Sequence, residues 1–355
     1  MEKGDEILNL TMDLIRFKSV KSNPDELKRI IDFVAHYLKR PGVSVKRFVR
    51  NQKHSAVFLP KGVKRPKLLL VCHADVVEAD DEDFIPRLKG NRLYGRGSYD
   101  MKAGLAIAMT VMKRYAGSKS VGLMVTTDEE IGGADGAGFL AKKYSADLVI
   151  ACEPSELTVE LKEKGMMVLK LVARGKACHG AYQWLGRNAA DELIKAYLKV
   201  RKKIPLLKKE SWKTSMNLGM MSAGPAPNIV PGRAEMTLDI RFTEHLSPDR
   251  ILKMIRSCLP KSVSLEVLKN EPMMVTRQKT PEMKMFYKAY QAVLGKKPVE
   301  TVIHGATDAR HFSNQGIPSM IFGFKGDNPH AKNEYANIPS IEKCYEIYEE
   351  FVKGL

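Results

Sequence analysis

The sequence predicts an α/β protein in which a mostly parallel sheet, layered between helices, is interrupted by an inserted α+β domain. At 355 residues the chain is too long for one typical core and suits two domains. Short apolar runs alternate with amphipathic helical segments up to about residue 152, and the alternation returns after about residue 279. Between these stretches the order of expected strands and helices changes, which is typical of a separate domain.

The first stretch has a strand–helix rhythm. The expected helices are 5–17, 24–39, 101–115 and 135–143. The expected strands are 43–49, 55–60, 67–72, 121–127 and 147–152. The second helix has a clear start, because Asn23 is a good N-cap and Pro24 suits the first helical position. Such alternation argues for a three-layer arrangement around a largely parallel sheet.

The middle of the chain follows another order. Its expected elements are strand MMVLKLVARG, helix 187–203, strands 215–222 and 234–242, helix 248–258 and strand 263–268. This β-α-β-β-α-β order matches a split-βαβ, ferredoxin-like unit. Helix 279–293, strands 300–303 and 318–323, and helix 340–353 resume the first style. We therefore expect a domain at 164–271, inserted into a domain built from 1–163 and 272–355.

Composition excludes several classes of protein. Hydrophobic residues make up 44% and charged residues 28%, as in ordinary soluble domains. No apolar run approaches the roughly 20 residues of a membrane span, and the N-terminus MEKGDEILNLTMDLIRF lacks the apolar core of a secretory signal. The five cysteines show no CxxC spacing, which excludes a disulfide framework and a thiolate zinc site. We expect a cytoplasmic protein without a membrane partner.

The net charge of +17 could attract an anionic substrate or nucleic acid. The lysines and arginines are spread along the chain, and no nucleic-acid motif or interleaving of aromatic and basic residues accompanies them. The charge therefore indicates a lysine-rich solvated surface, and we expect no specific nucleic-acid partner.

Residues that metals prefer follow several short apolar runs. They are His73 and Asp75, Asp100, Glu129 and Glu130, Glu153, and His330 in a polar loop. A strand delivers a ligand rigidly, and the C-terminal strand ends of open α/β sheets carry their chemistry. Two imidazoles and several carboxylates suit a pair of zinc-like ions. Together these segments predict a two-metal hydrolase site.

The spacing of these residues suggests separate roles. His73 and Asp75 are two apart in an extended segment and project to one side, so Asp75 can fix the tautomer of His73. Asp100 follows a glycine-rich turn without the third glycine or GK[ST] ending of a nucleotide loop, and its two oxygens could bridge two cations. Glu129 and Glu130 diverge, so one can bind metal while the other accepts a proton. Their alternative is a charged helix N-terminus.

Six segments carry a resemblance to a known family. They are HAD, GRGSYDMKAG, TTDEEIGG, CEPSE, HGATDAR and PHAKNE. In sequence, order and domain plan they resemble the dinuclear zinc metallopeptidase family of acetylornithine deacetylase, succinyl-diaminopimelate desuccinylase, aminoacylase and the glutamate carboxypeptidases. The resemblance covers nearly the whole chain, and it implies a catalytic domain with an inserted lid domain that dimerises.

The resemblance implies a ligand set for two divalent metal ions, zinc or else cobalt or manganese. His73, Asp100 and Glu153 would hold one ion. Asp100, Glu130 and His330 would hold the other, with Asp100 bridging.

Further roles are implied for residues around the metals. Glu129 would be general base and then general acid, and Asp75 would support His73. The Asp100–Met101 peptide is often cis in such enzymes. His179, in GKACHGAY, resembles the histidine that reaches across a homodimer to polarise the scissile carbonyl. Five residues resemble groups that bind substrate: Asn228, Arg241, Thr307, Asp308 and Arg310.

The implied activity is removal of the acyl group from an N-acyl amino acid through a metal-bridged hydroxide. Glutamate rather than aspartate at position 153, in the context CEPSE, favours the branch of succinyl-diaminopimelate desuccinylase and acetylornithine deacetylase, and with it amino-acid and lysine biosynthesis. A di- or carboxypeptidase of the same chemistry is an alternative, with a short peptide as substrate. A non-catalytic binding paralogue is another.

Overall fold

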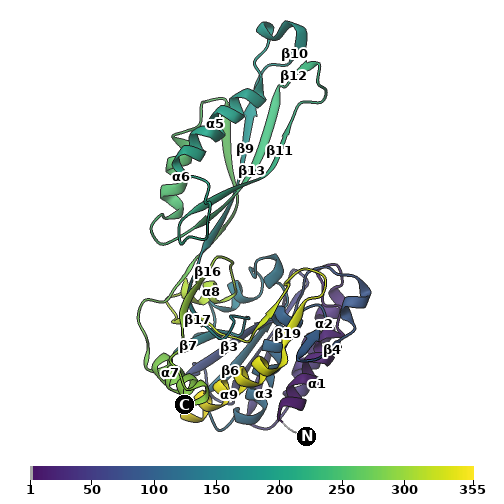
Figure 1. Cartoon of the computed structure of the whole chain (residues 1–355), viewed down its shortest axis with the longest axis vertical. Coiled ribbons are helices and arrows are strands. Elements are labelled where there is room, and N and C mark those ends of the chain that lie inside the picture. The colour runs from purple at the N-terminus through teal and green to yellow at the C-terminus, as the bar shows by residue number, and fades with distance from the viewer. Residues whose placement is uncertain (1–2) are drawn as a thin grey trace. The chain divides into compact units, whose positions relative to one another are not determined.

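The computed structural model describes residues 3–355 and divides them into two compact units (Figure 1). The discontinuous unit contains the chain up to Lys162, Met274–Val302 and Thr307–Leu355. The inserted unit contains Glu163–Met273 and the short segment Ile303–Ala306. The chain thus leaves the discontinuous unit, builds the inserted unit, and returns to finish the first.

A nine-stranded sheet forms the centre of the discontinuous unit in the described part of the chain. Its strands are β1 (Val43–Arg50), β2 (Lys53–Pro60), β3 (Leu68–His73), β6 (Val121–Thr126), β7 (Leu148–Ala151), β8 (Val159–Glu163), β15 (Met274–Val275), β16 (Glu300–Ile303) and β17 (Ser319–Ile321). They follow the order β1-β2-β6-β3-β7-β17-β8-β15, and β16 pairs with β8. The central strands β6, β3, β7 and β17 are parallel, as the strand–helix rhythm predicts.

The edges of this sheet are antiparallel, which the expectation of a mostly parallel sheet did not include. β1 and β2 pair antiparallel across a two-residue turn at Asn51 and Gln52, whose φ angles are 45° and 62°. A turn of this length with positive φ at both residues can join only antiparallel strands, because a parallel pair needs a long crossover. β17 also pairs antiparallel with β8.

Helices cover both faces of the sheet, so the unit has three layers. They are α1 (Lys3–Ile15), α2 (Pro24–Tyr37), α3 (Ala103–Tyr115), α4 (Ala137–Leu140), α7 (Pro281–Leu294), α8 (Ala309–Ser313) and α9 (Ile338–Gly354). Strand β3 shows the division: Leu68 and Leu70 pack with α1, α2, α3, α7 and α9, whereas Leu69 and Val71 pack with α4 and α8. This alternation is the two-residue period of a strand buried on both faces.

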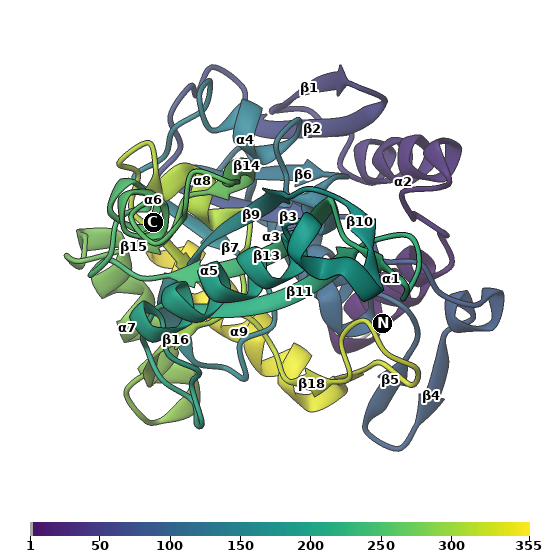
Figure 2. The same cartoon turned by 90° about the horizontal axis from the view of Figure 1, so that it is seen from above.

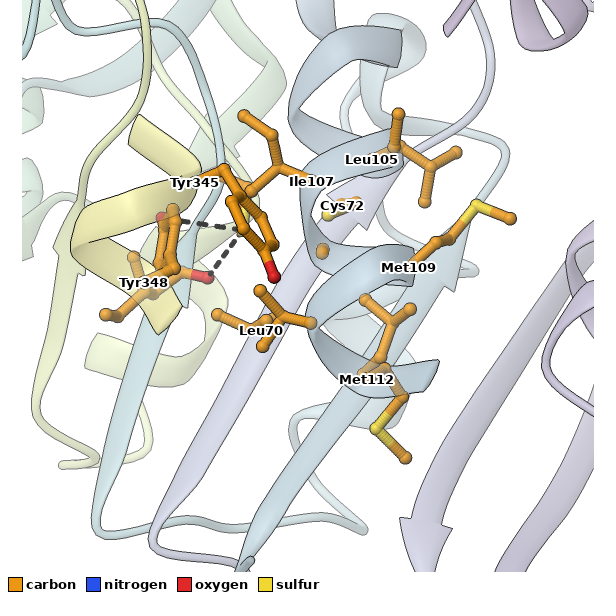
Figure 3. Packing of buried hydrophobic residues seen from close by; sticks show 14 of the residues in the cluster. Leu70, Cys72, Leu105, Ile107, Met109, Met112, Tyr345 and Tyr348 are labelled. Carbon is orange, nitrogen blue, oxygen red and sulfur yellow. Dashed lines mark hydrogen bonds between the residues drawn. The ribbon is translucent and has the colours of Figure 1, made fainter. Parts of the chain in front are cut away.

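Helix α3 lies at the centre of the larger core. Figure 3 shows Ile107 of α3 pointing towards Tyr345 of α9, with Leu70 of β3 between the two helices. Leu105 and Met109 extend from the other side of α3. Ten consecutive residues, Ala103 to Met112, are buried, so this helix is apolar all round rather than amphipathic. From α9, the Tyr348 hydroxyl donates to the carbonyl of Phe322 at 2.7 Å, which satisfies its polar atom inside the core.

The inserted unit is a four-stranded antiparallel sheet with α5 (Ala189–Lys203) and α6 (Pro248–Arg256) packed on it. The strands are β9 (Gly165–Arg174), β11 (Ser215–Ala223), β13 (Arg233–Phe242) and β14 (Val263–Glu271), in the order β11-β13-β9-β14. Figure 2 shows α5 lying along β9 and β13. This arrangement confirms the expected ferredoxin-like order.

Some elements differ from expectation. The helix expected at 135–143 is limited to the four residues of α4, in a segment that contains four glycines from Gly132 to Gly138. Regular helix begins at Ala103, because Asp100 and Met101 have non-helical dihedral angles. Four short strands form a further sheet that was not expected: β4 (Arg87–Lys89), β5 (Arg92–Tyr94), β18 (Gly326–Asp327) and β19 (Tyr335–Asn337). Among the described residues, no helix is long and apolar enough to cross a membrane.

The packing at β3 leads to a stability prediction. Leu70 is fully buried between layers, so Leu70→Ala should reduce the free energy of unfolding by about 2–5 kcal/mol through lost burial and the cavity left behind. Leu88→Ala, at a side chain that is 52% exposed, is the matched control and should change it by less than about 0.5 kcal/mol. Urea denaturation measures both, and equal losses would contradict the placement of Leu70 in the core.

Candidate metal centre

Three parallel strands end at the same edge of the sheet, and each carries metal-preferring residues there. His73 is the last residue of β3 and lies opposite Thr126, the last residue of β6. Glu129 and Glu130 begin the short 3₁₀ helix η3 (Glu129–Ile131), just beyond β6. Glu153 follows β7 by two residues. The parallel register therefore brings distant parts of the sequence together at one edge.

His73, Asp100 and Glu153 form the first cluster. The His73 Nε2 atom is 3.1 Å from Asp100 Oδ1 and 3.5 Å from Glu153 Oε1. The side chains of His73 and Glu153 are buried, and that of Asp100 is 22% exposed. One imidazole nitrogen and two carboxylates thus face a common point, and they come from three separate segments of the discontinuous unit.

Asp100, Glu130 and His330 form the second cluster. The His330 Nε2 atom is 3.2 Å from Asp100 Oδ2 and 3.2 Å from Glu130 Oε2. His330 has a positive φ of 62° in a loop whose Asn328 and Asn333 share that conformation, and its side chain is half exposed. Asp100 therefore presents one oxygen to each cluster, which is the arrangement a bridging carboxylate requires.

Asp75 holds both His73 and the glutamate pair, but not in the way that its spacing suggested. The Nδ1 atom of His73 lies 2.9 Å from the backbone oxygen of Asp75 and 3.6 Å from its carboxylate. A carbonyl oxygen only accepts, so Nδ1 carries the proton and Nε2 keeps its lone pair for a metal. The carboxylate of Asp75 instead accepts from the backbone N–H of Glu129 at 3.3 Å and of Glu130 at 3.1 Å.

The donor set fits two divalent cations. The lone pair of His73 Nε2 faces carboxylate oxygens. Both are hydrogen-bond acceptors, so they repel each other unless a proton or a metal cation lies between them. Glu130 Oε1 is buried without a hydrogen-bond partner among the described residues. Nitrogen and carboxylate ligands in groups of three, with room for a further ligand, are typical of catalytic zinc sites.

Burial and the neighbouring charges shift the pKa values of these ligands. Burial acts to lower the pKa of His73, but Glu153, Asp100 and Asp75 together raise it well above its ordinary value. Burial raises the pKa of Glu153 to about 7. Hydrogen bonds to Asp100 and Glu130 raise the pKa of His330 to about 10. Metal ions would release these protons, because only the deprotonated groups bind them.

Glu129 lies beside the clusters and is held by Arg310. Burial raises the pKa of Glu129 well above its ordinary value, Asp308 and Glu153 add to the rise, and His73 and Arg310 oppose it. The Arg310 Nη1 atom is 3.5 Å from Glu129 Oε1, and Nη2 donates to the carbonyl of Gly132 at 2.8 Å. A carboxyl group that gains a proton easily suits a general base that later acts as an acid.

Thr307, Asp308 and Arg310, expected on the substrate side, are at most 5% exposed. Asp308 accepts from the hydroxyl of Thr126 at 3.0 Å, and burial raises its pKa to about 7. Arg310 contacts the carboxylate of Glu129 and backbone carbonyls. The structure thus places this segment behind the proposed base, where it can position Glu129.

The remaining expected residues belong to the inserted unit. His179 ends β10 (Cys178–His179), which pairs with β12 (Ile229–Val230), and its Nδ1 accepts from the N–H of Ala181 at 3.1 Å. In this exposed side chain Nε2 is therefore the ring nitrogen that can donate. Asn228 accepts from Gly180 N–H through its backbone oxygen at 2.7 Å. Arg241 forms a forked pair with Asp239 at 3.0–3.3 Å, a partner that the sequence reasoning did not foresee.

Glu334 is a positioning residue that sequence reasoning missed. It is 3% exposed, and its Oε1 accepts from the backbone N–H of both Tyr99 and Asp100 at 3.0 Å. Its Oε2 accepts from Arg96 Nη1 at 2.6 Å. Glu334 thereby fixes the turn that carries the shared ligand. The segment PHAKNE contained it, but only the fold brings it to that turn.

The chain was compared with known protein families and with curated relatives. Residues 69–354 match the sequence profile of Peptidase family M20/M25/M40. A succinyl-diaminopimelate desuccinylase of Sulfurovum sp. is 25% identical over 381 residues, covering 98% of each chain. One of Rickettsia akari is 27% identical over 375 residues, covering 96% of this chain and 97% of that protein. A probable carboxypeptidase of Aspergillus terreus is 30% identical over 281 residues, covering 70% of this chain and 63% of that protein.

Solved structures share the fold across both units. A tripeptidase from Staphylococcus aureus has a TM-score of 0.82 at 22% identity, covering 99% of this chain and 98% of that chain. The aminopeptidase PepT from Bacillus cereus has a TM-score of 0.81 at 18% identity with the same coverage. The metallo-carboxypeptidase Sso-CP2 from Sulfolobus solfataricus has a TM-score of 0.80 at 20% identity, covering 99% of each chain.

The two clusters lead to a prediction about metal content. Glu130→Gln and His330→Ala should each lose about one metal ion per chain, because each change removes a ligand of the second cluster only. Glu129→Gln is the matched control and should keep both ions, since Glu129 belongs to neither cluster. Elemental analysis after dialysis measures the ratio. An empty second site in Glu129→Gln with a full one in Glu130→Gln would reverse the two assignments.

Proposed function

Because the chain belongs to Peptidase family M20/M25/M40, we propose that it is a two-metal amidohydrolase that removes the acyl group from an N-acyl amino acid. Family membership makes the chain a metal-dependent hydrolase of amide or peptide bonds. The observation that carries the proposed reaction is the shared Asp100 between two ligand clusters, with the largely buried Glu129 beside them. The desuccinylase relatives, which align over almost the full chain, support the choice of an acyl amino acid.

The site residues divide the work of the reaction. Two divalent ions, zinc or else cobalt or manganese, would activate a water molecule and polarise the scissile carbonyl. Glu129 takes the proton from the attacking water and delivers it to the leaving amine. Its carboxylate is ready for both steps, because burial favours the protonated form while Arg310 steadies the charged one. Asp75 keeps Glu129 in place through the backbone N–H bond.

His179 is proposed to donate from Nε2 to the carbonyl oxygen as negative charge develops there. Preorganised donors of this kind stabilise the transition state more than the ground state. Since His179 belongs to the inserted unit, we further propose that it acts on the site of a second chain and that residues 164–271 form a homodimer. The exposed edge strands β11 and β14 support this assembly.

Arg241 and Asn228 are proposed to bind oxygens of the substrate. Arg241 is about one-third exposed and already pairs with Asp239, so a substrate carboxylate would compete with, or share, that partner. Thr307 and Asp308, which belong to the discontinuous unit, would support the proposed base Glu129 from behind, because Arg310 donates to the carbonyl of Thr307 and contacts Glu129. With the desuccinylase relatives as guide, we place the reaction in amino-acid biosynthesis, specifically lysine biosynthesis, in the cytoplasm and without membrane or nucleic-acid partners.

A di- or carboxypeptidase is the second candidate. The probable carboxypeptidase of Aspergillus terreus has a higher identity than the desuccinylases, although over a shorter part of the chain. The same ligands and the same base would serve this reaction. The two candidates therefore differ in the acyl group that carries the scissile carbonyl, which is a simple acyl group for the deacylase and an aminoacyl or peptidyl group for the peptidase, and substrate preference separates them.

Substrate preference tests the proposal directly. With zinc, cobalt or manganese, the enzyme should hydrolyse N-succinyl or N-acetyl amino acids with a higher kcat/KM than dipeptides. Glu129→Gln should lower kcat by roughly 10²–10⁴-fold, because it removes general acid–base catalysis while the metal ligands remain. A higher kcat/KM for dipeptides would favour the peptidase. A metal-loaded protein that hydrolyses none of these substrates would overturn the proposal.

Subunit mixing tests the role of His179. His179→Ala should lower kcat by roughly 10²–10³-fold with little change in KM, because the lost contact forms mainly in the transition state. Mixing it with Glu129→Gln should restore activity, since a mixed dimer joins an intact base in one chain to an intact histidine from the other. The same proteins assayed separately are the controls. A fully active monomer in sedimentation, or a mixture no better than its components, would rule out action across a dimer.

A further inference from the structure

A small cavity adjoins the second ligand cluster in the discontinuous unit. Its volume is about 200 Å³, and Asp75 and Glu130 belong to its lining. The rest of the lining comes from the strand ends beyond β3 and β6 and from two lysines: Val76, Val77, Glu78, Thr127, Ile131, Lys21 and Lys53. The cavity therefore lies at the carboxyl edge of the parallel strands, where ligands of such sheets bind.

The acidic residues of the cavity already have partners. Asp75 accepts from the backbone of Glu129 and Glu130, and Glu130 faces His330 within the second cluster. Glu78 accepts from the backbone N–H of Ser22 at 3.3 Å. Their negative charges are thus directed at groups of the protein or at the metal position, and they do not define what enters the cavity.

The two lysines differ in this respect. Within the described chain, neither Lys21 nor Lys53 forms a hydrogen bond or ion pair through its side chain. Contacts of the neighbouring residues nevertheless fix the backbone position of each lysine. Val20, next to Lys21, bridges to Val76 of the wall, and His54, next to Lys53, exchanges hydrogen bonds with Thr127 at 2.8–3.0 Å. The two lysines, which have no side-chain partner among the described residues, therefore border the cavity at positions that its walls fix.

Apart from Thr127, the remaining walls are apolar, and the space is small. Val76, Val77 and Ile131 line it, and Ile131 is 41% exposed. A volume of about 200 Å³ is about seven times the roughly 30 Å³ that one water molecule takes in the liquid. That room suits a chain of a few methylene groups with a terminal anion, whose charge the lysine ammonium groups would meet.

We propose that this cavity binds the acyl part of the substrate and that Lys21 and Lys53 select an acyl group ending in a carboxylate. The inference rests on the proposed deacylase function and deepens it. Lys53, which is the less exposed of the two, supplies the larger part of the selection, because its ammonium group loses more competing water. The carboxylate of the amino-acid part is left to Arg241, in the inserted unit.

A pair of substrates that differ by one charge tests this inference. N-succinyl and N-succinamoyl derivatives of the same amino acid have nearly the same shape. The acyl group of the first ends in a carboxylate, and that of the second ends in a neutral amide. The ratio of their kcat/KM values on the metal-loaded enzyme measures selection. Lys53→Gln should lower that ratio about tenfold, and Lys21→Gln should lower it less. Lys53→Arg should keep most of it, because the charge remains.

Lys64→Gln is the matched control, since Lys64 is an exposed lysine that lines a different cavity, and it should leave the ratio unchanged. A ratio that stays constant in Lys53→Gln and Lys21→Gln would overturn the inference. Equal losses of kcat/KM for both substrates in Lys53→Gln would overturn the inference as well, because a lysine with a purely structural role would affect charged and neutral acyl groups alike.

Binding measurements separate failure of this inference from failure of the proposed function. Calorimetric titration of the metal-loaded protein with succinamate, which has an amide and a terminal carboxylate, and with succinamide, which has no carboxylate, needs no turnover. Tighter binding of succinamate that is lost in Lys53→Gln supports the cavity even if no amide in the panel is hydrolysed. Equal binding of the two compounds by the unaltered protein overturns the cavity assignment even if the enzyme is an active deacylase.

Discussion

The carboxylate of Asp100 lies between two imidazoles, and the other site residues are arranged around it. Its oxygens face His73 Nε2 at 3.1 Å and His330 Nε2 at 3.2 Å, in a region where Glu153 and Glu130 add further negative charge. Carboxylates gathered in this way repel one another unless positive charge lies among them. The protein therefore needs cations at this point. The buried hydrogen-bond network around Asp100 holds the ligands in place for the cations to bind.

That frame consists of hydrogen bonds from neighbouring segments rather than of the ligands themselves. Glu334 holds the turn of Asp100 through two backbone N–H groups, and Asp75 holds the start of η3 in the same manner. Arg310 steadies Glu129 from a fully buried position. Buried charged groups are costly unless they are paired and hydrogen-bonded, so each one marks a position whose geometry matters to the site.

Much of this could be predicted from sequence, and the failures have physical reasons. Strand ends at His73, Glu129 and Glu153 were recognisable because apolar runs precede polar residues of a kind that metals bind. The antiparallel pairing of β1 with β2 depends on the positive φ angles of Asn51 and Gln52, which an Asn-Gln dipeptide signals only weakly. Glu334 and the Arg241–Asp239 pair carry no periodic signal, so only the folded chain reveals their partners.

The insertion divides the ligands of the two clusters unequally along the chain. His73, Asp100 and Glu153 all precede it, as do the adjacent strands β1, β2, β6, β3 and β7, whereas His330 and Glu334 follow it. During synthesis, the complete ligand set of the first cluster thus emerges more than a hundred residues before the last ligand of the second. The two positions, though they share Asp100, have different histories in the nascent chain. The ligands of the first cluster are therefore made before the inserted unit, whereas His330, and the Glu334 that holds the turn of Asp100, are made only after the chain returns.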